Sequence, residues 1–277
     1  LMAAAGIALV FNWYSAAIDF LFSVIWFMYE VLLITPVERS NIKKMVDHIV
    51  RYCIAMGTAL MIGAFLFLPA ALAMSDGKGN VEWIPILGIY GWGNIFSFIQ
   101  RFELGSRSEY GSVSLYCGSL AVIGCIAYML CKKIDRNKKI LHSILIVFVL
   151  SLFYIPVFVW GFSLLKVVGS YWYRYSYIGI ITLIVIAAEF FSVKDQETNT
   201  RALMWKATAV AVLVLFFMEY VKPLGKPFNV YMTVLAFIAT MLFTDILFWT
   251  KRVSVKRIVI FLMAVTVSTE LVYNAKL

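Results

Sequence analysis

The chain has 277 residues, of which 63% are hydrophobic and 16% aromatic, and its mean hydropathy is +0.90. A soluble domain of this length would not need so much apolar surface, so the composition excludes a globular soluble protein and indicates one that crosses a membrane repeatedly. The formal net charge of +9 does not indicate nucleic-acid binding, because the sequence has no interleaved soluble structure to carry a basic face; anionic lipid head groups are its natural counter-charge.

Successive apolar stretches predict about eight transmembrane helices, since a helix rises 1.5 Å per residue and roughly twenty residues cross a hydrocarbon core of about 30 Å. In chain order they cover residues 15–34, 49–73, 114–131, 140–160, 176–193, 203–221, 229–249 and 258 to the end. Residues 1–10 are apolar but too short to cross alone. We expect an all-α, polytopic bundle that forms a single transmembrane domain over residues 1–277.

Lysine and arginine are distributed unevenly between alternate loops, which predicts the orientation in the membrane. The loops at 35–48, 132–139, 194–206 and 250–257, with their flanks, contain 16 of these residues, whereas the intervening loops contain 7. The first set should therefore face the cytoplasm and the second set the outside.

The segment 75–113 is the longest predicted external loop, and loops of this length are commonly functional or contain structure of their own. Residues 83–99 are too apolar for a solvated linker and too short and glycine-broken for a span. We therefore expect an interfacial or re-entrant element here, followed by a mixed-charge cluster that contains Arg101 and Arg107. The alternative is an ordinary polar loop held at the membrane by its aromatic residues.

A second cationic feature precedes the helix predicted from residue 176. Arg174 lies among five aromatic residues between positions 171 and 177. Arginine offers a planar, permanently charged fork that suits phosphate and stacks on aromatic rings. The alternative is an aromatic belt with a snorkelling arginine, which is common at membrane interfaces.

Six carboxylates lie in or near the predicted spans, where an ionised group is costly unless it faces a cavity or a partner. Those toward the external ends, which could line an outward-facing cavity with Arg174, are Asp19, Glu219 and Glu270. Those toward the cytoplasmic ends, which should pair with the cytoplasmic lysines and arginines, are Glu30, Glu189 and Asp245.

Signals for other chemistries are weak. The sequence contains no GxxxxGK, and the glycines at 88, 91 and 93 follow no strand and have the wrong order for a dinucleotide loop. Its cysteines and histidines show no ligand spacing. The sequence therefore predicts neither a nucleotide site nor a metal site.

Four short motifs lie in order along the chain, each at a similar place relative to a predicted span. They are Asn12-Trp13-Tyr14, Tyr116-Cys117-Gly118, Arg174-Tyr175-Ser176-Tyr177 and Glu270-Leu271-Val272-Tyr273-Asn274-Ala275. Together they resemble the YfhO family of bacterial multi-pass membrane proteins, which are similar to GT-C glycosyltransferases. The chain starts without an initiator methionine and stops at an apolar stretch, so we expect it to be the middle portion of a longer member.

The resemblance implies transfer of a sugar from a polyprenyl-phosphate carrier to a cell-envelope acceptor, such as a teichoic or lipoteichoic acid, on the outer face of the membrane. Enzymes of this kind usually carry their catalytic carboxylate in a first external loop, which would lie upstream of Leu1, so no base is assigned. A divalent metal could assist at the phosphate, although no Asp-rich pair here would hold one. The residues expected to contact lipid phosphate or sugar are Arg174, Tyr175, Arg101, Arg107, Tyr116, Glu270 and Asn274.

Two alternatives belong to other classes of protein. A flippase or secondary transporter of lipid-linked sugars often shows paired, broken helices and charges at the bilayer midplane. Here the prolines lie near helix ends, most ionisable residues lie near the interfaces, and no internal repeat is evident, which favours the transferase. A scaffold that recruits envelope-synthesis partners is the third class, and the long external loop argues mildly against it.

Overall fold

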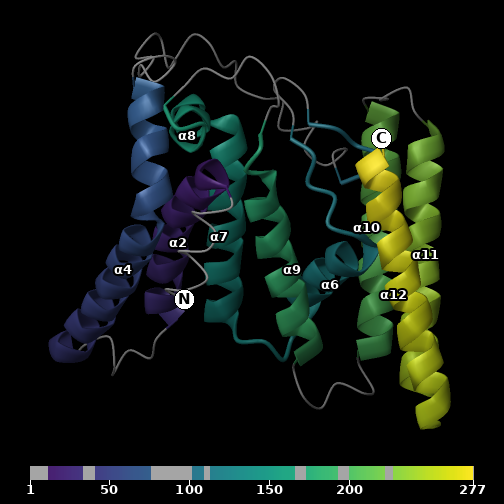
Figure 1. The fold of residues 1–277 in the computed structure, drawn as a ribbon. Helices are drawn as coiled ribbons and strands as arrows, with labels where there is room; N and C mark the ends of the chain where they lie inside the picture. Colours follow the sequence, from purple (N-terminus) through teal and green to yellow (C-terminus); the bar gives the residue numbers. More distant parts are fainter. Residues whose placement is uncertain are drawn as a thin grey trace. The chain divides into compact units, whose positions relative to one another are not determined.

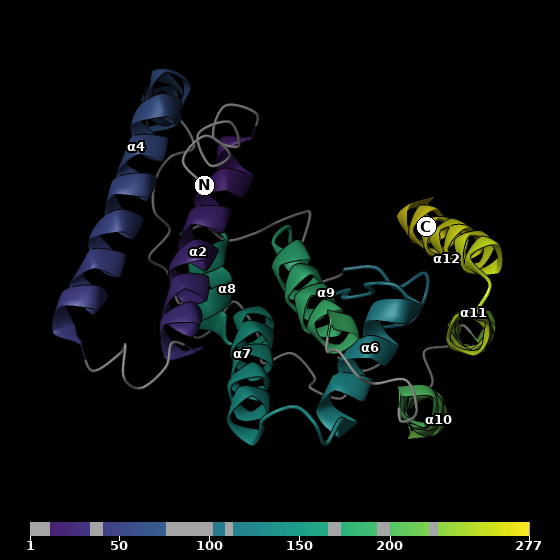
Figure 2. The same ribbon diagram turned by 90° about the horizontal axis from the view of Figure 1, so that it is seen from below.

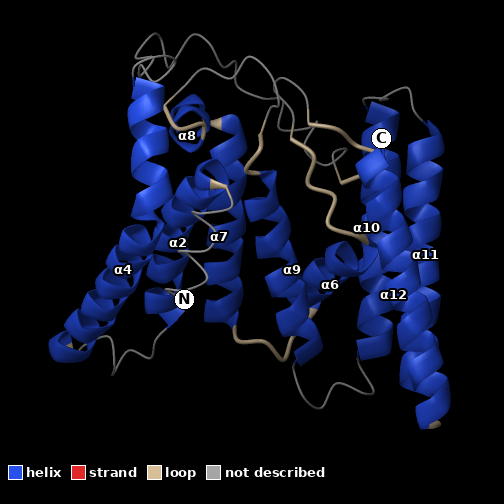
Figure 3. Cartoon of the chain, in the orientation of Figure 1, coloured by secondary structure: helices blue, strands red, loops and turns tan. Residues whose placement is uncertain are grey.

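The structure is a computed structural model, and it describes residues 12–33, 41–75, 102–108, 113–165, 173–192, 200–221 and 227–276. Within these ranges every regular element is a helix and none is a strand (Figure 3). The helices are α2 (Trp13–Leu33), α4 (Ile42–Ser75), α6 (Ser119–Leu130), α7 (Arg136–Tyr154), α8 (Pro156–Phe162), α9 (Ser176–Ser192), α10 (Thr200–Val221), α11 (Pro227–Trp249) and α12 (Val253–Lys276). The predicted all-α fold is therefore confirmed.

Several of these helices are suited to a bilayer. Five described helices, α2, α4, α7, α10 and α11, are long and apolar enough to cross a membrane. Two more, α6 and α9, are apolar but shorter, with 12 and 17 residues. The chain is accordingly a multi-pass membrane protein.

One predicted span is broken by a proline. The sequence favoured a continuous helix over residues 140–160, but α7 ends at Tyr154, Ile155 has an extended backbone, and α8 begins at Pro156. Proline has no N–H to donate to the preceding turn and pushes the residue before it out of the helical region. Pro156 is tolerated as a first helical residue, where that N–H would be unsatisfied in any case.

A second predicted span starts late. The helix expected from residue 114 begins only at Ser119, and residues 113–118 are not helical. Gly118 has φ +89° and ψ 148°, a backbone conformation in which a side chain is strained. The glycine therefore sets where the chain turns into α6.

The described residues form two compact units, and the first contains α2, α4 and α8. Asn12 and Asn41 begin α2 and α4 in the same way, since each side-chain oxygen accepts a backbone N–H three residues later. Figure 1 shows α2 and α4 side by side. Tyr52 of α4 joins them, since its hydroxyl lies 2.7 Å from that of Ser23 and its ring stacks on Phe27 with centroids 4.4 Å apart. The caps thus fix the starts of α2 and α4, and the contacts of Tyr52 link the two helices.

The second unit contains α6, α7 and α9 to α12. Its core forms around α6, which packs against α9, α10 and α11. Figure 2 shows α10, α11 and α12 nearly end-on, one after another, and contacts join each to the next. Fully buried residues at the centre include Ile123, Tyr128, Phe190, Met204 and Phe237.

Small residues let α6 and α9 approach closely. A Cβ atom added to Gly124 would lie 2.9 Å from the Cβ of Ala187, and one added to Gly179 would lie 2.8 Å from the Cδ2 of Leu115. Close packing through small residues is typical of helix pairs in membranes. Leu115 lies against Gly179, and further along both segments Gly124 lies against Ala187. The two segments therefore run in the same direction, and α6 and α9 begin at the same end of the unit.

Candidate functional site

The candidate site is built around the non-helical segment 113–118. Its backbone is buried in the protein, with Val113 and Leu115 fully buried and Tyr116 only 2% exposed. Non-helical backbone in a membrane protein must find hydrogen-bond partners inside the protein, because hydrocarbon offers none. Here the backbone N–H of Ser114 donates to the Ser108 hydroxyl over 3.0 Å, so the neighbouring segment 102–108 supplies a partner. Both loop segments are drawn in tan in Figure 3.

Glu270 of α12 caps the start of α6 from another helix. Gly118, at the N-cap position, has no side chain to offer, and the backbone N–H of Ser119 donates instead to Oε2 of Glu270 over 2.8 Å. The Ser119 hydroxyl donates to Oε1 over 2.7 Å, and the Tyr116 hydroxyl donates to Oε2 over 2.7 Å. A carboxylate at a helix N-terminus is also favoured by the helix dipole. Glu270 is 5% exposed, and both of its oxygens accept hydrogen bonds.

Thr240 of α11 completes this cluster. Its hydroxyl lies 2.5 Å from that of Ser119. Since the Ser119 hydroxyl donates to Glu270, the Thr240 hydroxyl is the donor in this contact. The cluster of Tyr116, Ser119, Thr240 and Glu270 therefore links α6, α11 and α12 through one carboxylate.

The segment 102–108 is attached to the same two helices. The backbone N–H of Leu104 donates to the Thr233 hydroxyl over 2.9 Å, and that of Gly105 donates to Oδ1 of Asn274 over 2.8 Å. The hydroxyls of Ser106 and Ser114 lie 2.6 Å apart and connect it to the segment before α6. The following residue, Arg107, is exposed, so this anchored turn holds a cationic side chain at the surface.

The turn before α9 is held by aromatic packing. Tyr175 is 1% exposed, donates its hydroxyl to the carbonyl of Leu152 over 3.0 Å, and stacks on Phe153 with ring centroids 5.2 Å apart. Tyr173 has φ +56°, which is strained for an aromatic residue and is held by the packing of its ring against Phe153 and Tyr175. Between the two buried tyrosines Arg174 is exposed.

The residues that the sequence indicated for the site are thus partly brought together. Tyr116 and Glu270 are in direct contact, and Asn274, one turn further along α12, holds the turn that precedes Arg107. Arg174 and Tyr175 lie at the start of α9, the same end of the unit as the start of α6. Arg101 and the whole of the interfacial element expected at residues 83–99 lie outside the described residues.

Three residues of the site were not predicted, namely Ser119, Thr233 and Thr240. A signal for two of them exists in the sequence, since Thr233, Thr240 and Thr244 recur at spacings of seven and four and are all buried on one face of α11. A hydroxyl stripe in an apolar helix indicates a polar contact with a neighbour. The direction in which the Ser119 side chain points depends on the residue at which α6 begins, and the spacing of apolar residues alone does not predict that residue.

Three carboxylates toward the predicted cytoplasmic ends of the helices were expected to pair with basic residues, and two of them, Glu189 and Asp245, do so. Asp245 of α11 forms an ion pair with Arg201 of α10 through two hydrogen bonds. Glu189 of α9 lies 3.5 Å from the Lys138 amine and 3.0 Å from Nε2 of the buried His142. The prediction that these two groups pair with basic residues is confirmed.

The chemistry of the site depends on which of its charged side chains are buried and which are exposed. Glu270 is engaged inside the protein, so it acts as a positioning residue for the segments around it. Arg107 in segment 102–108 and Arg174 in the turn before α9 are exposed cations of a type suited to an anionic ligand. Among the described residues, no three His, Cys, Asp or Glu side chains lie together as a metal site would require.

Comparison with known protein families identifies the family of the chain. The family described as bacterial membrane protein YfhO matches residues 1–277, the whole chain. No curated protein and no solved structure matches it.

Proposed function

The chain belongs to the YfhO family of bacterial membrane proteins, and from this premise we propose that it is part of a membrane glycosyltransferase. The sugar donor is a polyprenyl-phosphate carrier, and the acceptor is a cell-envelope polymer of the teichoic or lipoteichoic acid class on the outer face of the membrane. The observation that carries the proposal is the cluster around Glu270, which together with Asn274 anchors two loop segments at the predicted external end of α6.

In this proposal the cations bind the phosphate of the donor. Arg174 is the first choice, because it is exposed just before the start of α9, and Arg107 and Arg101 are the second choices. Negative charge develops on the leaving phosphate, and a fixed arginine stabilises that charge. Tyr175 is buried, so its role is to hold the turn that presents Arg174.

At the anomeric carbon of the sugar the reaction forms one bond and breaks one. The acceptor hydroxyl attacks the anomeric carbon of the sugar, its proton passes to a carboxylate at the outer interface, and the bond between that carbon and the phosphate oxygen breaks. The polyprenyl phosphate leaves with the electron pair of the broken bond. The family resemblance puts the base upstream of Leu1, and Tyr116, Glu270 and Asn274 supply a wall of the site.

The test uses the full-length protein in lipid vesicles with labelled polyprenyl-phosphate sugar and with acceptor on the external side. Arg174→Ala should lower transfer by about a hundredfold, as removal of one transition-state contact typically does. The matched control is Arg136→Ala, an exposed arginine at the first position of α7, which should leave transfer unchanged. Equal transfer by wild type and Arg174→Ala would exclude the proposed phosphate contact.

A second candidate function is transport of lipid-linked sugars. The observation that favours it is the late start of α6, because buried non-helical backbone next to a membrane helix also occurs in transporters. The same vesicles separate the two functions. Labelled donor that crosses the bilayer without being consumed would replace the transferase with a transporter.

A further inference from the structure

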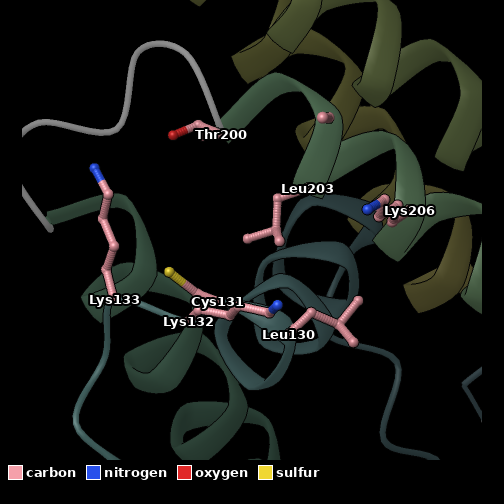
Figure 4. A pocket seen from close by; sticks show the side chains of 8 residues that line it. Leu130, Cys131, Lys132, Lys133, Thr200, Leu203 and Lys206 are labelled. Carbon is pink, nitrogen blue, oxygen red and sulfur yellow. The ribbon is translucent and has the colours of Figure 1, made fainter.

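A pocket of about 400 Å³ lies at the other end of α6, between the end of that helix and the start of α10. Its size falls in the range of small-molecule sites in proteins. Figure 4 shows its lining side chains, with Lys133 at one edge and Lys206 at the opposite edge. The residues that line it include Leu130, Lys132, Lys133, Thr200, Leu203 and Lys206.

The pocket carries a concentrated positive charge. Three of its eight lining residues are lysines, and none of the described lining residues is acidic. Thr200 is the first residue of α10, a 22-residue helix whose N-terminus adds partial positive charge, while the partial negative charge at the end of α6 is countered by Lys132 and Lys133 directly after it. Lysines from the loop after α6 and from α10 therefore present positive charge to an anion in the pocket.

We propose that this pocket binds a phosphate-bearing anion, either the head group of an anionic phospholipid or a soluble phosphate. Lysine binds phosphate as a point charge, and basic pockets between membrane helices bind anionic lipid head groups. The lysines belong to loops predicted to face the cytoplasm, where anionic lipids are the counter-charge.

Apolar surface beside the lysines suits the lipid form of this ligand. Leu130 and Leu203 line the pocket, and Leu130 is 41% exposed. A second, almost entirely apolar cavity of about 300 Å³ lies further along the same two helices and is lined by Ile126 and Val210 among others. Val210 is seven residues beyond Leu203, which corresponds to about 10 Å along α10. A head group among the lysines therefore has an apolar surface for its acyl chain within reach.

This inference does not rest on the proposed glycosyltransferase function. The pocket begins at Leu130, eleven residues along α6 from Ser119, so about 17 Å of helix separates it from the Glu270 cluster. Loss of anion binding and loss of sugar transfer are accordingly separate outcomes.

The test is binding of phosphatidylglycerol to the full chain in a neutral detergent, measured as bound-lipid species by native mass spectrometry. The triple variant Lys132→Gln, Lys133→Gln, Lys206→Gln should weaken binding by about a hundredfold, since each lysine near an anionic surface contributes about fivefold. The matched control is Lys251→Gln, Arg252→Gln, Lys256→Gln, which removes the same charge from another predicted cytoplasmic loop and should change binding less than about threefold. If the pocket triple fails to fold, Lys206→Gln alone should weaken binding by about fivefold.

A parallel titration with inorganic phosphate at constant ionic strength identifies the source of the anion. Phosphatidylglycerol binding that phosphate displaces only at millimolar concentration identifies the lipid. Saturable phosphate binding without lipid binding identifies a soluble ligand of the same pocket. Equal losses in the two triple variants, or no saturable binding of either probe, would overturn the proposal.

Discussion

Replacement of Glu270 by glutamine and by alanine should have different effects on stability, because the two changes leave different groups unsatisfied. In the alanine variant the Tyr116 hydroxyl and the Ser119 backbone N–H both lose their acceptor while buried. Each stranded donor costs about 1–3 kcal/mol, so Glu270→Ala should destabilise the protein by about 2–6 kcal/mol. The Ser119 hydroxyl can turn to Thr240, and the Thr240 hydroxyl, which is the donor in the native contact, can turn to a carbonyl one turn earlier in α11, so neither adds to this cost.

Glutamine keeps the same contacts in neutral form. Its amide oxygen can accept from Tyr116 and from the Ser119 N–H, and its amide nitrogen can donate to the Ser119 hydroxyl, whose own proton then turns to Thr240. The hydrogen bonds are weaker without the charge, but a buried charge is no longer desolvated. The net loss should be about 1 kcal/mol or less.

The assay is reversible unfolding in detergent, followed by tryptophan fluorescence, with Thr269→Ala as a control on an exposed neighbour in α12. An equal loss of stability for Glu270→Gln and Glu270→Ala would refute the reasoning, because it would mean that the charge and not the set of hydrogen bonds matters. Transfer assays add a second criterion. If Glu270 is a positioning residue, the glutamine variant should retain sugar transfer, whereas a catalytic base would lose it in a folded protein.

Three further predictions concern backbone and helix contacts, each checked by the same unfolding assay. Gly118→Ala should cost about 1–3 kcal/mol, because φ is +89° although the nearest atom to the new Cβ would be 3.7 Å away; no loss would mean that the chain adopts another conformation there. Gly124→Ala should cost about 1–3 kcal/mol by overpacking against Ala187, whereas Gly57→Ala, with open space around its Cβ, should be neutral or stabilising. Thr233→Val should cost about 1–3 kcal/mol, since the buried Leu104 N–H loses its acceptor; an unchanged midpoint would contradict that contact.

The helices could be predicted from the sequence because their signal is local. Runs of apolar residues gave α9 and α11 within two residues of their ends, and the two pairings at the opposite ends of the helices followed from depth and charge alone. The late start of α6 was missed because residues 114–118 contain no charged residue and no proline and join directly onto the apolar run that follows. What excludes helix there is the positive φ of Gly118, which depends on contacts with α12 that lie about 150 residues away.

The site was predicted in part for a similar reason. The resemblance drew attention to Tyr116, Gly118 and Glu270, and the structure supplies a physical reason for all three, because the glycine permits the turn and the carboxylate caps the helix that starts after it. Sequence spacing contains no information on this contact between helices. The break in α7 at Pro156, by contrast, could have been predicted from proline chemistry alone.

A buried carboxylate in a membrane protein is costly, so its retention needs a compensating role. At Glu270 the compensation is structural, since one side chain satisfies the start of α6 and holds Tyr116, while Asn274 on the same face of α12 holds the turn before Arg107. An apolar residue at position 270 would leave the Tyr116 hydroxyl and the Ser119 backbone N–H without their acceptor. Rigid placement of an exposed arginine next to the membrane is of little use to a scaffold but is what a phosphate site requires. We therefore propose that the burial of Glu270 serves a binding site at this end of the unit as well as stability.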